Sequence, residues 1–594
     1  MRVSFVAALA FTLFTTIRVP GETSTMDAQF EKLGAQYIEQ FAKFSPVRAT
    51  DVGDHRFDDE LDEISEEARI GQADWIRGLI AALNQIEAGQ LSRRNQVDYA
   101  LLRQALDSRL WRLTELREWE WNPLIYTGLA GDSLYGLMAR NFAPERQRLN
   151  NATKRLEQFP RFLKQVRETL VVHRVPAIHA STAADQNRGV LSVLDNMIRP
   201  RMSTLPEAER QQLAQAIRVA EEAVGEHQQW LESKLVPNAK GNFRIGREQF
   251  DRKLSFTLHS PLAREQIRDL GERRVRELHA QMYEIAKDIY HKQYPLTQFP
   301  DEPSDEYRRT IIRFGLEQAC AERPAADQVV ETAKESAGSA TEFIRKKDLI
   351  TVMPDPLEII IMPEFRQGVS LAYCDSPGPL EVGQKTFYAV SPIPAKWSEK
   401  QADSFLREYN TRSLDVLTIH EAMPGHFLQL AHANRYPGKL RHLFQSGVFV
   451  EGWAVYTEWM MCEEGFRDDD PLLKLITLKW YLRDVTNALL DQAVHVDGIS
   501  RYDAMQMMVE DAFQEEREAA GKWKRAQLTS AQLSTYFVGY LEQIETRRAT
   551  EQAWGDRFDL KTYHDRALSY GSPPPQFVRA LLLERAIPHD AVIK

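Results

Sequence analysis

The stretch Leu414-Asp-Val-Leu-Thr-Ile-His420-Glu421-Ala-Met-Pro-Gly-His426-Phe-Leu-Gln429 begins as a helix and is interrupted before its second histidine. In the familiar H-E-x-x-H motif, the two histidines lie one helical turn apart and share a face. Here they are six residues apart, about 600° of rotation, which leaves the imidazoles about 120° apart on an unbroken helix. Pro424 and Gly425 favour a break or bulge, because proline removes a helix hydrogen bond and glycine accepts unusual backbone angles. We expect this break to return His426 to the face of His420.

A second acidic pattern follows in the segment 448–458, where Glu451 and Glu458 share one helical stripe opposite an aromatic stripe. Zinc binds nitrogen and oxygen donors, and a catalytic zinc site leaves its fourth position to water. We therefore expect a Zn²⁺ site formed by His420, His426 and Glu451, with Glu421 as the general base. Glu458 is expected to orient a ligand from outside the coordination sphere. The alternative is that these residues are ordinary polar side chains at a helix end and exposed charges.

Working outward from this segment, helix periodicity dominates the chain. Phe30, Leu33, Tyr37, Ile38 and Phe41 recur at helical steps, and the Ser45-Pro46 step ends that helix. Similar patterns predict helices at 70–87, 95–113, 144–173, 207–235 and 261–291, and from residue 403 to the end. Two short β-branched or aromatic runs, 357–362 and 386–390, predict a small sheet just before the histidine motif. The fold class expected is mainly α with this small sheet.

The length of 594 residues exceeds the size at which one hydrophobic core stops growing. We expect an N-terminal helical lobe at 26–300 and a catalytic helical lobe at 301–594 that contains the small sheet. The proline- and acid-rich segment 294–305 marks the boundary, and one continuous domain is the alternative.

Composition excludes several classes of protein. A formal net charge of −10 without a basic block argues against a nucleic-acid partner. Beyond the N-terminus no apolar run is long enough to cross a bilayer, so stable membrane insertion is not expected. Cys320, Cys374 and Cys462 form no C-x-x-C pair, so metal ligands must be histidine and carboxylate.

Residues 1–25 read as an export signal. Arg2 gives a positive start, 3–17 is almost wholly apolar or small, and Val19-Pro20-Gly21 offers a small-residue cleavage site. We expect a periplasmic or secreted protein. If Met26 is the true start, the protein is cytoplasmic.

The His-Glu-Ala-x-Pro-Gly-His and Glu-Gly-Trp-Ala-x-Tyr-x-Glu segments, taken together, resemble the domain of unknown function 885 family. Its members are mostly bacterial, often exported proteins regarded as candidate zinc peptidases. Further matching segments cover nearly the whole mature chain: Ser45-Pro46, Gly53 to Asp58, Gly368 to Tyr373, Asp491-x-x-x-His495 and Tyr536-Phe537-x-Gly539. The resemblance implies a large two-lobed helical fold with a deep cleft, similar to the carboxypeptidase Taq and peptidyl-dipeptidase A families. Those families use the shorter histidine spacing.

The segment 534–540 is similar to one of peptidyl-dipeptidase A in which a tyrosine hydrogen-bonds the oxyanion. Carried over, Tyr536 takes that role, and His495 is a second candidate donor. A core aromatic and a satisfied structural histidine are the alternative interpretations. The strand at 386–390 is a candidate for pairing with the backbone of a peptide substrate.

These residues predict peptide-bond hydrolysis, by a carboxypeptidase or a peptidyl-dipeptidase. A carboxypeptidase also needs a cation for the terminal carboxylate, and Arg435, Arg501 and Lys524 are candidates by location. The other hypotheses are a non-catalytic metal-containing peptide-binding protein and a metal-dependent hydrolase of non-peptide amides or esters. No G-x-S-x-G elbow supports a serine hydrolase. Cleavage specificity, oligomeric state and the native metal stay open.

Overall fold

The computed structural model describes residues 25–362, 372–381, 383–393 and 397–588. The chain is mainly helical, with one small sheet, as predicted. Residues 1–24 of the export signal predicted at 1–25, and most of the Gly368–Tyr373 segment, lie outside the described residues. Among those that are described, no helix combines the length and apolar character needed to cross a membrane.

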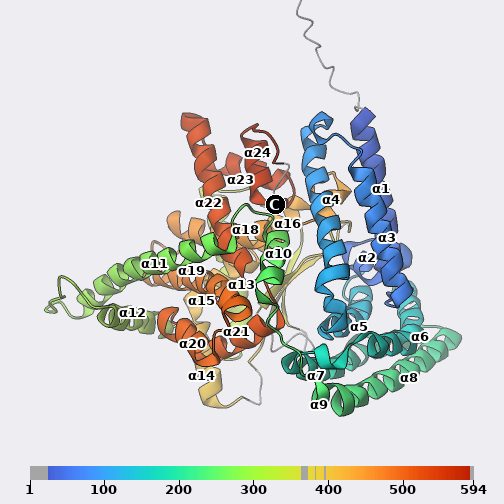
Figure 1. Ribbon diagram of the computed structural model, residues 1–594. Coiled ribbons are helices and arrows are strands. Elements are labelled where there is room, and N and C mark those ends of the chain that lie inside the picture. Colours follow the sequence, from blue (N-terminus) through green and yellow to red (C-terminus); the bar gives the residue numbers. More distant parts are fainter. Residues whose placement is uncertain (1–24, 363–371, 382, 394–396, 589–594) are drawn as a thin grey trace, which may run out of the picture.

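The N-terminal helices pack side by side and form the blue-to-teal half of the molecule in Figure 1. Their bounds are α1 Thr25–Phe44, α2 Pro46–Val52, α3 Glu66–Leu83, α4 Arg93–Trp111, α5 Leu124–Met138, α6 Glu145–Thr169, α7 Ala177–Val193, α8 Glu207–Trp230 and α9 Val236–Asn238. The helix predicted from Phe30 to Phe41 is confirmed, because α1 buries Phe30, Leu33, Tyr37 and Phe41. Pro46 occupies the first turn of α2, where its missing N–H costs nothing.

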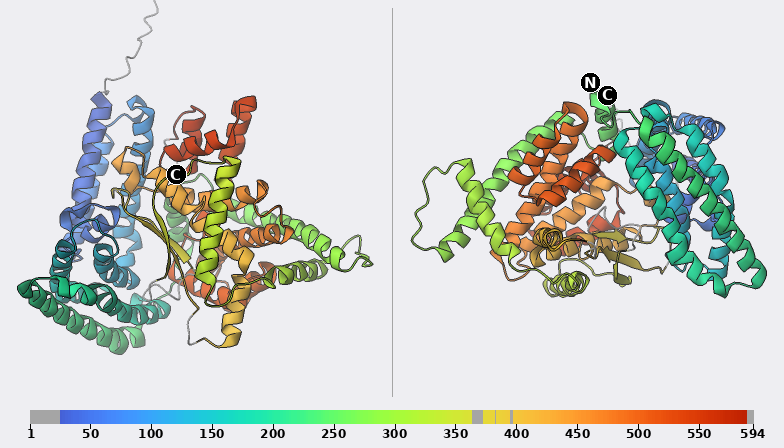
Figure 2. Two further views of the ribbon diagram at one scale, coloured as in Figure 1. Left: turned by 180° about the vertical axis from the view of Figure 1, so that it is seen from behind. Right: turned by 90° about the horizontal axis from the view of Figure 1, so that it is seen from below.

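The remaining elements form the green-to-red half, on the other side in both views of Figure 2. Their bounds are α10 Gly246–Leu258, α11 Arg264–Gln293, α12 Asp305–Cys320, α13 Val329–Lys347, β1 Leu357–Ile361, β2 Ala372–Asp375, β3 Thr386–Val390, α14 Glu399–Glu408, α15 Thr411–Glu421, α16 His426–Ala433, α17 Lys439–Leu443, α18 Gly447–Glu463, α19 Pro471–Gln492, α20 Arg501–Gln506, α21 Glu516–Leu528, α22 Ser534–Trp554, α23 Leu560–Ser569 and α24 Pro575–Leu582. Helices α10 and α11, which precede the expected boundary at residue 300, already contribute to the large core of this half.

The sheet has the order β1-β3-β2, with β1 parallel and β2 antiparallel to β3. Both predicted strands are present, and β2 was not predicted. Because β3 is paired on both sides, the expectation that 386–390 pairs with substrate is wrong. A free edge is available only at β1 or β2 among the described strands.

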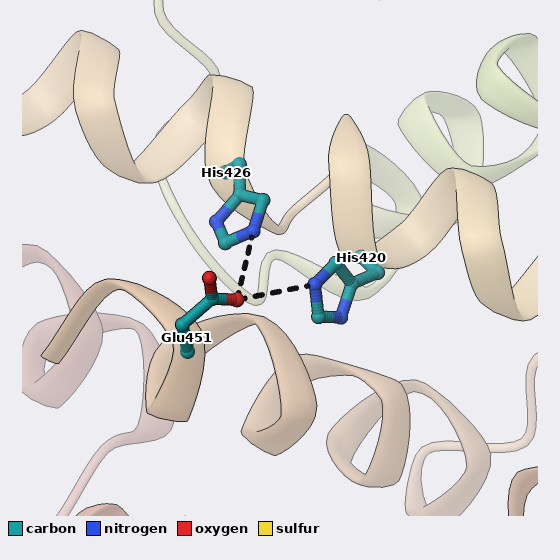
Figure 3. Close-up of side chains that lie close together, drawn as sticks. All are labelled: His420, His426 and Glu451. Carbon is teal, nitrogen blue, oxygen red and sulfur yellow. Dashed lines mark ion pairs between the residues drawn. The ribbon is translucent and has the colours of Figure 1, made fainter. Parts of the chain in front are cut away.

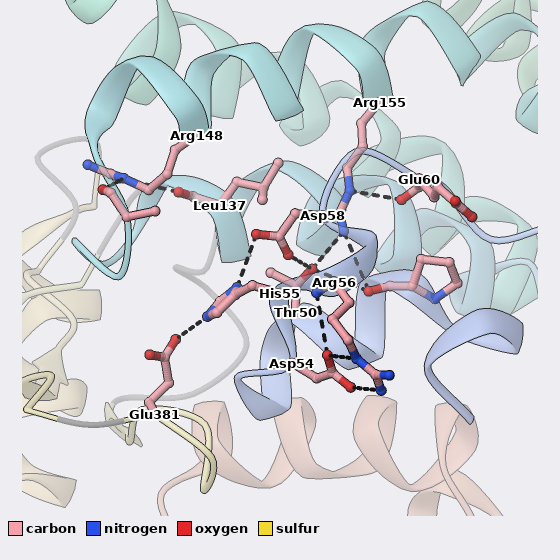
Figure 4. Close-up of polar contacts among 12 residues, drawn as sticks. Thr50, Asp54, His55, Arg56, Asp58, Glu60, Leu137, Arg148, Arg155 and Glu381 are labelled. Carbon is pink, nitrogen blue, oxygen red and sulfur yellow. Dashed lines mark hydrogen bonds and ion pairs between the residues drawn. The ribbon is translucent and has the colours of Figure 1, made fainter. Parts of the chain in front are cut away.

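A charged contact joins the two halves at the segment Gly53–Asp58 (Figure 4). The ring of His55 lies between two carboxylates, with Nδ1 3.0 Å from Asp58 Oδ2 and Nε2 3.0 Å from Glu381 Oε1. It also stacks on Phe142, with 3.7 Å between ring centroids. Burial lowers the pKa of His55, but the two carboxylates outweigh burial and raise it to about 9. His55 is therefore a charged link between α2 and the β2–β3 connection.

Replacing His55 with asparagine is expected to destabilise the fold most at low pH. The folded pKa of about 9 lies above the ordinary value of 6.5, so the stabilisation is full below pH 6.5 and is lost as pH rises through 9. Its size is at most about 3 kcal/mol. Thermal unfolding at pH 6, 8 and 10 measures it, with the exposed His173→Asn variant as control. A difference from wild type that does not shrink at high pH would contradict this assignment.

Candidate metal centre

The two histidines come from two helices that a short turn separates. α15 ends at Glu421 and α16 begins at His426. Between them the N–H groups of Ala422 and Met423 both bond to the carbonyl of Thr418, and the N–H of Gly425 bonds to Ile419. The helix is therefore broken rather than bulged, and His426 starts a new helix in a new direction.

Gly425 is required for this turn because the backbone folds closely onto α15. A Cβ atom at this position would lie 2.0 Å from the carbonyl oxygen of His420 and 2.3 Å from that of Ile419. Both neighbours are backbone atoms, which cannot move aside as a side chain can. The turn is also tied to α18, because the Trp453 indole N–H donates to the Pro424 carbonyl at 3.0 Å.

His420, His426 and Glu451 converge as Figure 3 shows. One oxygen of Glu451 lies 3.6 Å from Nε2 of His420 and 3.4 Å from Nε2 of His426. Two ligand atoms at about 2.0–2.1 Å from a tetrahedral zinc ion are about 3.3–3.4 Å apart, so the spacing fits ligands that share one cation. All three ligand atoms lie within 4.8 Å of one another.

Hydrogen bonding within the described part of the chain supports the same interpretation. That oxygen of Glu451 is buried and has no hydrogen-bond partner among the described residues, although two histidines face it. Buried carboxylate oxygens are rarely left without a partner. A divalent cation between the three side chains satisfies this oxygen and both imidazole nitrogens, so the donor set fits zinc.

The charges of the site are strongly coupled. Burial lowers the pKa of His420, but Glu451 and Glu458 outweigh burial and raise the pKa well above its ordinary value. Burial raises the pKa of Glu451, but His420 and His426 outweigh it, and the net shift is strongly downward. Glu451 is therefore an anion, ready to bind a cation.

Glu458 lies where the sequence predicted an outer partner. Its Oε1 is 2.7 Å from Nδ1 of His420, and the side chain is almost fully buried. A hydrogen bond from Nδ1 to this carboxylate fixes the ring, so that Nε2 is the atom from which a metal ion would displace a proton.

Glu421, the predicted general base, is held by the sheet. Its Oε2 accepts a hydrogen bond from the backbone N–H of Cys374 in β2 at 3.0 Å. The neighbouring Asp375 is in turn bound by the N-terminal half, through the hydroxyl of Tyr135 at 2.6 Å and the guanidinium of Arg140 at 2.9 Å. Both halves of the molecule thus contribute to the position of Glu421.

A contact between two glycines brings α22 to the site. Gly452 of α18 and Gly539 of α22 meet backbone to backbone, since a Cβ on Gly452 would lie 2.3 Å from the carbonyl carbon of Gly539. Gly452 follows Glu451 directly, and Gly539 lies one helical turn after Tyr536. The close approach of the two glycines therefore brings Tyr536 towards Glu451. The ring of Tyr536 stacks on His420 with 6.4 Å between centroids.

The hydroxyl of Tyr536 is arranged as a donor. It accepts hydrogen bonds from Arg525 at 3.3 Å and from Gln532 at 3.4 Å, which leaves its own proton free. Burial, reinforced by Glu451, raises the pKa of Tyr536, so this proton is retained at neutral pH.

A family model described as "Bacterial protein of unknown function (DUF885)" matches residues 46–582. The chain belongs to this family. No protein of curated function matches it.

Two solved structures have the same fold. One, a "putative lipoprotein of unknown function" from Shewanella oneidensis, is 32% identical, with a TM-score of 0.78 over 93% of this chain and 99% of that one. The other, a "putative lipoprotein" from Colwellia psychrerythraea, is 17% identical, with a TM-score of 0.77 over 95% of this chain and 99% of that one.

In this DUF885 chain, backbone carbonyls hold the ring of His495. Its Nε2 lies 2.9 Å from the carbonyl of Ala526 and 2.8 Å from that of Thr529, so it binds the end of α21. Burial lowers its pKa to about 4, and the ring is neutral. The expectation that His495 donates to an oxyanion is wrong, because its Nε2–H is already used within the fold.

The three cations named from sequence lie at the surface. Arg435 is 45% exposed and pairs with Asp355, and Arg501 and Lys524 are exposed. Sequence reasoning missed Lys522 and Arg525 on the inner side of α21. The sequence gives only a weak signal, the helical spacing of Ala519, Lys522 and Ala526, and the structure buries all three.

The deep cleft stays a prediction. The cavity lined by Arg274 and Tyr540 and the one lined by Trp121 and Arg244 include none of the metal ligands. His420, Glu421 and His426 each keep 9% of their surface exposed, so the site is narrow but reachable.

Proposed function

We propose that this protein is a zinc-dependent peptidase. The proposal rests on one observation, the convergence of His420, His426 and Glu451 at the spacing of ligands that share a tetrahedral cation. Glu421 follows His420 directly and is not a member of the ligand set, as a general base requires.

A zinc ion bound by these three residues would lower the pKa of a water molecule and polarise a substrate carbonyl. Glu421, oriented by the Cys374 N–H, would accept a proton from an attacking water molecule and deliver it to the leaving amine. Tyr536 donates its free proton as a hydrogen bond to the oxygen on which negative charge develops. β2 offers an edge beside Glu421 for the backbone of an extended peptide.

Metal analysis beside a peptide-cleavage assay tests the proposal. Purified wild type is expected to contain about one zinc per chain and to hydrolyse members of a peptide library. If the metal is present and no peptide is cleaved, the peptide-binding hypothesis is favoured. Cleavage of simple amides or esters in preference to peptides would favour the third hypothesis.

His426→Ala is expected to lose most of its zinc and its activity, because one of three ligands is removed. Zinc content by atomic absorption measures this, with the exposed His291→Ala as a matched control that keeps its metal. Retention of zinc by the His426 variant would show that the second histidine is not a ligand.

Export is part of the proposal. The apolar start of the chain and the description of both solved relatives as lipoproteins support it. Fractionation of cells that express the full chain, or the chain from Met26, tests it. We expect only the full chain outside the cytoplasm.

A further inference from the structure

Helix α21 carries cations to which the peptidase mechanism assigns no contact with substrate. Lys522 is only 6% exposed, and Arg525, one turn further along, is partly buried. Arg483, from α19, faces the same region. These three side chains form what we call the inner cationic cluster.

Arg483 and Lys522 are only loosely paired with their nearest acid. That acid is Glu518, 3.7 Å from Arg483 Nη1 and 4.0 Å from Lys522 Nζ, both too long for a hydrogen bond. Glu518 also accepts a hydrogen bond from the hydroxyl of Tyr409 at 3.1 Å. Nε and Nη1 of Arg483 are buried without any hydrogen-bond partner among the residues described.

Burial and the neighbouring Arg483 lower the pKa of Lys522 to about 7, although Glu518 opposes the shift. Other acids also face the two arginines. Burial lowers the pKa of Arg483, but Glu518, Asp484 and Glu408 outweigh burial and raise it. Burial likewise lowers the pKa of Arg525, and Tyr536 and Glu451 outweigh it. Buried charges are normally paired. Buried arginine donors that no described residue satisfies can be satisfied by an anionic ligand.

The cluster reaches the metal centre through Arg525. Its guanidinium donates to the hydroxyl of Tyr536 at 3.3 Å and to Gln532 at 2.8 Å. Tyr536 in turn stacks on His420. One residue of an extended peptide spans about 3.3–3.6 Å, so an anion at the cluster lies within one or two residues of a carbonyl at Tyr536.

We propose that Lys522, Arg525 and Arg483 bind the C-terminal carboxylate of a peptide and make the enzyme act one or two residues from a free C-terminus. This inference rests on the proposed peptidase function. It assigns the carboxylate-binding role to these three residues instead of the surface cations Arg435, Arg501 and Lys524.

The test uses N-acetyl-trialanine and its C-terminal amide. Binding to metal-loaded Glu421→Gln protein is measured by calorimetry, and hydrolysis by wild type is followed by mass spectrometry. We expect the acid to bind at least about tenfold more tightly than the amide, because only the acid pairs with the buried cations. Lys522→Met and Arg525→Met are expected to remove this preference and to raise KM more than they lower kcat. Lys524→Met, at an exposed position of the same helix, is the matched control and keeps the preference.

Stability separates binding from a structural role. Because Lys522 is buried beside two other cations, Lys522→Met is expected to raise the melting temperature, whereas a structural ion pair would make it fall. If Lys522→Met does not fold, Arg525→Lys and Arg525→Met carry the binding test.

The outcomes of the two proposals are distinguishable. Preferential binding of the acid without hydrolysis supports the carboxylate site and contradicts the peptidase. Hydrolysis with equal binding of acid and amide, or no binding of either at millimolar concentration, overturns the carboxylate site.

Discussion

Replacing Glu421 with glutamine is expected to lower kcat for peptide hydrolysis by about 10²- to 10⁴-fold and to leave the zinc content unchanged. Glutamine is the same size and keeps an oxygen to accept the hydrogen bond from Cys374, so the local geometry is retained. It cannot accept the proton of the water. The loss therefore reports proton transfer rather than metal binding.

The control for this variant is Glu399→Gln, the same substitution at an exposed position of α14. Both proteins are assayed for zinc, for kcat and for melting temperature. If Glu421→Gln keeps kcat within a factor of about three of wild type, Glu421 is not the general base of the reaction.

Replacing Gly425 with alanine is expected to destabilise the protein by more than about 3 kcal/mol and to abolish zinc binding. The new Cβ would overlap the carbonyl oxygens of His420 and Ile419, at 2.0 and 2.3 Å. Relief requires the turn to open, and opening carries His426 away from His420. A single methyl group next to His426 would thus remove a candidate ligand.

Gly225→Ala is the matched control, because a Cβ there, within α8, meets nothing within 4 Å. Alanine in a helix interior is worth about 0.5–1 kcal/mol over glycine, so this control is expected to gain stability. Denaturant unfolding and zinc analysis of both variants measure the contrast. A Gly425→Ala protein with normal stability and full zinc would show that the turn tolerates a side chain.

Local patterns were sufficient for much of the fold. The apolar spacing from Phe30 to Phe41 predicted α1, and the run 386–390 predicted β3, because each element follows from the period of its own residues. β2 was missed, since its four residues, Ala372–Asp375, carry too short a pattern. The prediction that 386–390 lies at a free edge was wrong for a different reason, because strand order depends on residues far apart in the chain.

At the candidate site, too, local spacing predicted some residues, and packing decided the others. Glu458 was placed correctly as an outer partner because it lies two turns from Glu451 on one helical stripe. His495 was misjudged, because only packing brings its ring against the end of α21. Lys522 was passed over in favour of Lys524, since the face that α21 buries depends on what packs against it.

The sequence by itself determined the helical class and the two strands at 357 and 386. It also determined that a Pro-Gly break separates His420-Glu421 from His426, and that a helix with two glutamates follows. Those properties are local, because they arise from the spacing of apolar side chains along the chain and from the backbone angles that Pro424 and Gly425 favour. Only the tertiary structure decided that Glu451 lies beside His420 and His426, that Cys374 holds Glu421 and that Tyr536 meets Arg525. These contacts join distant helices, and their distances are set by close packing such as the approach of Gly452 to Gly539, which no local pattern encodes.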